Sequence, residues 1–147
     1  MEDILISSRE FNEARRKIRE NQGKRIVFTS QDDDLSRKVL EKENIQVLLI
    51  NQSGRRDRLK QRNSGFNQVL AKIAKKKGVA IGINLDEILN ADKEEKAKIL
   101  ARIEQNIVLC NKNKLKMAFL SKLPRDQYDL KALGVVLGMP TWMTKAV

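Results

Sequence analysis

The chain has 147 residues, of which 41% are hydrophobic, and a formal net charge of +11. That length and the regular apolar segments are those of a folded domain and exclude a disordered polyelectrolyte. Histidine is absent, which removes the usual general acid/base, the imidazole metal ligand and the common partner of a nucleophilic serine or cysteine.

We expect a soluble, cytoplasmic protein that does not enter a membrane. Its one cysteine, Cys110, cannot form an internal disulfide, as is usual in a reducing compartment. Cys110 lies on the apolar side of a predicted helix, which favours a buried, unreactive thiol. The N-terminal residues MEDILISSREF lack a basic region followed by a long apolar run, so no targeting signal is predicted.

Short apolar runs alternate with amphipathic helices along the chain. Most of the runs are continuous and aliphatic, which is typical of strands buried on both faces of a parallel sheet. The predicted strands are 4–7, 25–29, 45–51, 79–85 and 115–121. Helical periodicity fills the intervals between them, and Pro140 predicts the start of a last helix that ends near Val147.

The helix before the fourth strand is the most clearly marked. Asn63 or Ser64 is its predicted N-cap, and Gly78 is its predicted left-handed end. Its apolar residues recur at helical spacing and are expected in the core. They are Phe66, Val69, Leu70, Ile73 and Ala74.

Alternating strands and helices predict right-handed βαβ units and an α/β fold with parallel strands, as one domain over residues 1–147. Two architectures fit five such units: an open doubly wound sheet, or part of a (β/α) barrel. A complete barrel of eight units normally needs about 200 residues or more, so it does not fit.

Asp32, Asp33 and Asp34 follow a predicted strand, where α/β folds place their active sites. Three carboxylates could hold Mg²⁺ in a nuclease site. Adjacent residues that enter a helix point in different directions, however, and acids are common in a first helical turn because they complement the helix dipole. The capping interpretation is favoured.

Positive charge is concentrated between Ser53 and Gly78, where nine Lys or Arg residues stand against one acid, Asp57. A solvated helix face is the ordinary explanation for such residues, but elsewhere in the chain charges of both signs alternate. An uncompensated block predicts phosphate contact. The predicted RNA-binding residues are Arg55, Arg56, Arg58, Lys60, Arg62, Lys72, Lys75, Lys76 and Lys77.

The same region resembles a known family. A basic residue precedes Ser-Gly-hydrophobic-Asn, a Val-Leu-Ala-Lys-hydrophobic-Ala helix follows, and the next strand begins Gly-Val. The matching residues are Arg62, Ser64-Gly65-Phe66-Asn67, Val69-Leu70-Ala71-Lys72-Ile73-Ala74 and Gly78-Val79. This pattern resembles the signature of the archaeal and eukaryotic ribonuclease P subunit known in archaea as protein component 3, and a weaker likeness extends over residues 10–147.

The resemblance implies a truncated, TIM-barrel-like fold related to metal-dependent phosphoesterases but without their metal site. Family members usually carry one or two further βα units before the region that matches Met1, so we expect a partial barrel. It also implies a subunit with no catalytic residue, metal ligand or cofactor of its own, in a ribonucleoprotein whose RNA holds the Mg²⁺.

The expected function is to support the RNA-catalysed removal of the 5′ leader from precursor tRNA by binding and stabilising the catalytic RNA. The expected partners are ribonuclease P RNA, protein component 2 and other ribonuclease P subunits, with precursor tRNA contacted indirectly. Two alternatives stay open at this point: a Mg²⁺-dependent nuclease that uses Asp32, Asp33 and Asp34, and a generic basic RNA-binding module.

Overall fold

The computed structural model describes residues 3–145, in which five strands alternate with helices. In chain order the elements are β1 (Asp3–Ser7), α1 (Phe11–Glu20), β2 (Arg25–Thr29), α2 (Asp33–Lys42), β3 (Val47–Ile50), α3 (Gln68–Lys77), β4 (Ala80–Asn84), α4 (Leu85–Asn90), α5 (Lys93–Lys112), β5 (Met117–Leu120), α6 (Gln127–Val136) and α7 (Thr141–Thr144). The five predicted strands are confirmed to within two residues at each end. The short helix α4 was not predicted, and the predicted last helix extends beyond the described residues.

The strands form one parallel sheet in the order β1-β2-β3-β4-β5. A doubly wound sheet reverses its strand order at a switch point, and this one does not. Right-handed crossovers between strands in sequential order place the helices on the same face, as in a (β/α) barrel. The parallel α/β prediction is confirmed, and β1 and β5 are the edge strands within residues 3–145.

The helix-facing side of the sheet carries most of the core. One row of paired residues crosses all five strands and is almost completely buried against the helices: Ile6, Phe28, Leu48, Ile81 and Met117. The opposite face holds a smaller apolar cluster around Val27, Val47 and Leu49. Strands with apolar side chains on both faces explain the continuous aliphatic runs in the sequence.

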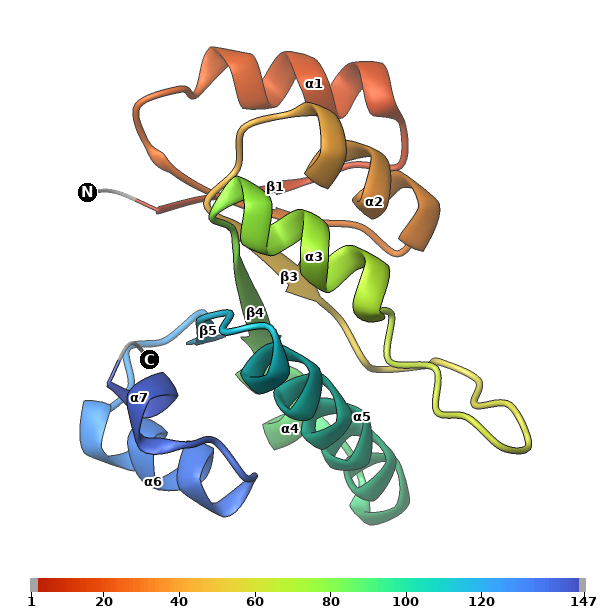
Figure 1. Cartoon of the computed structure of the whole chain (residues 1–147), viewed down its shortest axis with the longest axis vertical. Helices are drawn as coiled ribbons and strands as arrows, with labels where there is room; N and C mark the ends of the chain where they lie inside the picture. Colours follow the sequence, from red (N-terminus) through yellow and green to blue (C-terminus); the bar gives the residue numbers. More distant parts are fainter. Residues whose placement is uncertain (1–2, 146–147) are drawn as a thin grey trace.

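Helices α1, α2 and α3 lie side by side along the sheet, and α5 contacts α3 (Figure 1). The segment between β3 and α3 projects sideways from the body beside α5, away from α1 (Figure 1). Within residues 3–145, no helix has the length and apolar character needed to cross a bilayer.

Two details of the predicted third helix are wrong. Asn67 caps α3, because its side-chain oxygen accepts a hydrogen bond from the backbone N–H of Leu70 at 2.9 Å. Val69 is 49% exposed, and Ala71, which was not among the predicted core residues, is buried beside Leu70 and Ala74. Phe66 reaches the core from the preceding loop, and Gly78 ends the helix at φ 70° as predicted.

Cys110 gives a direct test of core packing around α5. The side chain is fully buried, and burial raises the pKa of its thiol to about 12. Because the thiolate is the nucleophile, iodoacetamide at pH 8 should leave the native protein unmodified and alkylate it fully in denaturant, as mass spectrometry would show. Rapid alkylation of the native protein would contradict this packing of α5.

Candidate nucleic-acid interface

Residues 51–67, here called the basic loop, connect the carboxyl end of β3 to the start of α3. The loop contains one backbone bridge, between Arg58 and Gln61, whose N–H···O distances are 2.9 and 3.3 Å. This bridge closes a two-residue turn formed by Leu59 and Lys60. The loop therefore ends in a small hairpin, which projects from the body (Figure 1).

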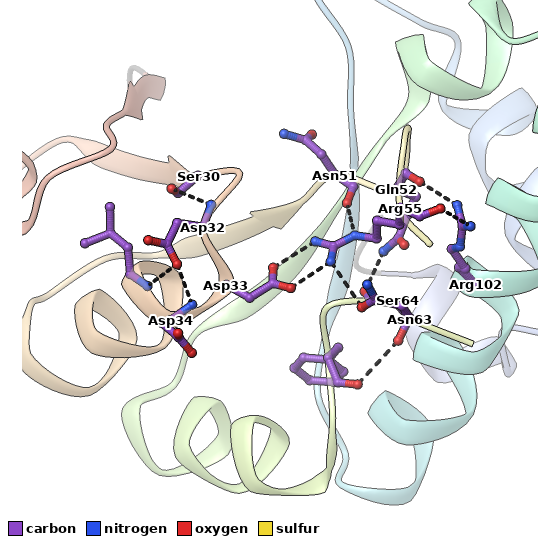
Figure 2. A network of polar contacts seen from close by, with 12 residues as sticks. Ser30, Asp32, Asp33, Asp34, Asn51, Gln52, Arg55, Asn63, Ser64 and Arg102 are labelled. Carbon is purple, nitrogen blue, oxygen red and sulfur yellow. Dashed lines mark hydrogen bonds and ion pairs between the residues drawn. The ribbon is translucent and has the colours of Figure 1, made fainter. Parts of the chain in front are cut away.

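Arg102 on α5 holds the base of the basic loop. Its side chain is 1% exposed, and its guanidinium donates to the carbonyl oxygens of Gln52 at 2.8 Å and Arg55 at 2.7 Å (Figure 2). The third donor, Nε, lies 3.0 Å from the Oδ1 atom of Asp57. A buried charge is costly unless it is paired and hydrogen-bonded, and here three groups of the loop satisfy it.

The residues after Arg102 on α5 fasten the other end of the loop. Asn106 Nδ2 donates to the carbonyl of Ser64 at 3.3 Å, and Gln105 Nε2 donates to the Ser64 hydroxyl at 3.2 Å. The side chain of Gln52 reaches the same Ser64 carbonyl at 2.8 Å (Figure 2). One face of α5 thus fixes both the departure and the return of the basic loop.

Arg55 ties the loop to α2. Its guanidinium makes a two-pronged contact with the carboxylate of Asp33, at 2.8 and 2.9 Å, and its Nε donates to the Asn51 carbonyl (Figure 2). Gly65 packs against this guanidinium: a Cβ there would lie 2.7 Å from Arg55 Cζ, and the backbone φ of +72° also favours glycine. Arg55, a predicted RNA-binding residue, is 12% exposed and bound internally.

The three adjacent aspartates have separate roles. Asp32 is the N-cap of α2, and its Oδ1 atom accepts hydrogen bonds from the N–H groups of Asp34 and Leu35 at 3.0 and 3.3 Å. Asp33 is paired with Arg55, and Figure 2 shows the carboxylates of Asp32 and Asp33 directed to different partners. The capping prediction is confirmed. Over residues 3–145, no group of three or more His, Cys, Asp or Glu is placed to hold a metal ion.

The remaining predicted RNA-binding residues are exposed and fall into two groups, one on the basic loop and one on α3. Four lie on the basic loop: Arg56, Arg58, Lys60 and Arg62. The others lie on α3, from the middle of this ten-residue helix to its C-terminal end: Lys72, Lys75, Lys76 and Lys77. Two of these already donate to carbonyls, Lys75 to Lys114 and Lys77 to Glu43, both at 3.1 Å.

The sequence prediction missed Arg102, Gln105 and Asn106. A signal was present, because Arg102 and Asn106 lie at helical spacing within the apolar stripe of α5. That stripe contains Ile99, Ile103, Ile107 and Cys110. A charged or amide side chain inside such a stripe needs buried partners, and here the basic loop supplies them.

Known proteins resemble this chain in sequence. No family model matches the chain. Ribonuclease P protein component 3 of Methanococcus maripaludis strain C7 is 24% identical over 143 residues, which cover 96% of this chain and 59% of the relative. That of Methanosarcina acetivorans is 34% identical over 83 residues, or 53% of this chain and 35% of the relative. The chain is similar in sequence to ribonuclease P protein component 3.

A solved structure shares the fold. A chain in the cryo-EM structure of archaeal ribonuclease P with mature tRNA superposes with a TM-score of 0.80 at 22% sequence identity, covering 98% of this chain and 63% of that one. The chain spans roughly three fifths of the length of the first relative it matches. The family resemblance seen in the sequence is confirmed.

The Arg102 contact makes a prediction about acid stability. The hydrogen bond from Arg102, then that from the Asn63 N–H, lowers the pKa of the Asp57 carboxyl below its usual 3.8. A carboxyl whose pKa is lower in the folded state stabilises above its unfolded pKa and loses that effect as pH falls through the folded value. Urea unfolding should therefore show that wild type has a larger free energy of unfolding than Asp57→Asn. The difference should be constant from pH 7 to about pH 4 and should shrink between pH 4 and pH 3.

The control for this experiment is Glu104→Gln, which removes an exposed carboxylate from the same helix as Arg102. The difference in free energy of unfolding between wild type and Glu104→Gln should not change with pH as it does for Asp57→Asn. Parallel stability curves for wild type and Asp57→Asn down to pH 3 would show that Arg102 does not lower the pKa of Asp57 in the folded protein.

Proposed function

We propose that the chain is a protein subunit of ribonuclease P, a cytoplasmic ribonucleoprotein, and supports removal of the 5′ leader from precursor tRNA. The observation that carries this proposal is homology to component 3 over 96% of the chain. In this role the protein binds and stabilises the catalytic RNA, and the RNA, with its own Mg²⁺, performs the cleavage.

The geometry supports an RNA-binding role for the basic loop. Arg56, Arg58, Lys60 and Arg62 are exposed on a segment whose ends are fixed by buried hydrogen bonds to α5. Guanidinium and ammonium groups bind phosphate oxygens strongly. Because the loop is already held in place, less conformational entropy is lost when RNA binds. Arg55 contributes indirectly in this proposal, by holding the loop against α2.

The proposed partners are ribonuclease P RNA, protein component 2 and other protein subunits, with precursor tRNA contacted through the assembled particle. The fold match supports such an assembly, since the matching chain was solved within archaeal ribonuclease P with mature tRNA. The alternative of a Mg²⁺-dependent nuclease has less support, because Asp32 caps α2 and Asp33 is paired with Arg55.

Reconstitution tests the function directly. The purified chain should increase cleavage of precursor tRNA when it is added to ribonuclease P RNA and the other protein subunits, and should cleave nothing alone in Mg²⁺. Cleavage by the chain alone that disappears in Asp32→Asn would instead support the nuclease alternative. A reconstituted particle whose cleavage and assembly are the same without the chain would reject the subunit role.

The salt dependence of RNA binding tests the interface. Removing one ionic interaction with a phosphate should reduce the slope of log K against log salt by about 0.7 for single-stranded RNA and by about 0.9 for a duplex. The triple variant Arg56→Gln, Arg58→Gln, Arg62→Gln should therefore bind more weakly and with a clearly shallower slope.

The matched control removes the same charge on or beside α1: Arg9→Gln, Arg16→Gln, Lys24→Gln. These residues are exposed on or beside α1, far from the basic loop (Figure 1). If both triple variants changed the slope equally, binding would follow net charge and the basic loop would not be the interface.

A further inference from the structure

Leu59 is the most exposed large hydrophobic residue among those the structure describes. It lies in the two-residue turn at the tip of the basic loop, and its relative exposure is 106%. A single exposed leucine is ordinary on a protein surface. This one is unusual because the surrounding hydrogen bonds hold it away from the body of the protein.

The hairpin that carries Leu59 is braced at successive levels. The Arg58–Gln61 bridge closes the turn, and below it the Asn63 N–H donates to Asp57 Oδ1 at 2.8 Å. Asp57 is in turn held by the buried Arg102 at 3.0 Å. The buried Arg102 therefore fixes the position of the tip, and Leu59 would lose little conformational entropy on binding a partner.

The charges around Leu59 indicate what kind of partner fits. Arg56, Arg58, Lys60 and Arg62 flank it in the sequence, and each is exposed. An apolar protein surface that covered Leu59 would have to desolvate these cations without compensation. An RNA strand offers phosphates to the cations and the face of a base or a ribose to the leucine. Aromatic residues make up only 4% of the chain, so leucine is the apolar group available on this loop.

We propose that Leu59 is a non-ionic RNA contact that packs against an unpaired nucleobase while the flanking cations bind the adjacent phosphates. Apolar side chains that insert beside bases are an established means of nucleic-acid recognition. The inference rests on the proposed RNA-binding function and adds to it a residue that responds to unpaired bases rather than to charge.

Leu59→Ala separates this contact from the ionic ones. The variant should bind an RNA that has unpaired loop bases about tenfold more weakly, as expected when most of a buried leucine side chain is removed. Its salt slope should equal that of wild type, because every ionic interaction with a phosphate remains. Leu59→Phe should bind this RNA at least as tightly as wild type does, since an aromatic ring stacks on a base. A fully paired duplex should show no such differences.

Leu123→Ala is the matched control, because Leu123 is also an exposed leucine, at 64%, but lies between β5 and α6. It should bind RNA as wild type does, and thermal unfolding should show both alanine variants equally stable.

Equal RNA affinity of Leu59→Ala and wild type would overturn the inference, while a persisting slope change in the arginine triple variant would leave the proposed function intact. Absence of RNA binding by wild type would instead reject the proposed function. Weaker binding of Leu59→Ala to a ribonuclease P protein rather than to RNA would also overturn the inference.

Discussion

The buried guanidinium of Arg102 is the contact on which the proposed interface depends. A loop of seventeen residues without a helix or strand would ordinarily sample many conformations, and a basic one would be spread further by repulsion between its charges. Arg102 donates to Gln52, Arg55 and Asp57 near the start of the loop. Its planar fork of donors matches these three acceptors, and a lysine, with a compact ammonium, could not bridge them in the same way.

Two further constraints work together with Arg102. The Arg55–Asp33 pair ties the loop to the first turn of α2, and the contacts to Ser64 tie its return to α5. Each tie uses a residue at or near the carboxyl end of the sheet, where parallel α/β folds gather their functional loops. The acidic first turn of α2 serves structure here, and the exposed arginines of the loop are left available for phosphate.

The parallel sheet and the region of concentrated positive charge could both be predicted from the sequence. The ends of strands such as 25–29 could be predicted from the apolar runs because both faces of each strand are buried. The capping role of Asp32 could be predicted because acids complement the dipole of a first helical turn. The division of the nine basic residues could not be predicted, since charge alone does not distinguish Arg55, which pairs with Asp33, from Arg56, which faces solvent. That distinction arises from tertiary contacts between α2, α5 and the loop, which are distant in sequence.

Native-state hydrogen exchange on Arg102→Met tests the central claim most directly. Methionine fills a similar volume without donors, so the core can remain packed while the loop loses its anchor. We expect much faster exchange of the Arg58, Gln61 and Asn63 amides, whose acceptors lie in the hairpin. The Ile81 amide, which donates to Lys116 across β4 and β5, should keep its protection. Unchanged exchange of the three loop amides would show that Arg102 does not hold the basic loop.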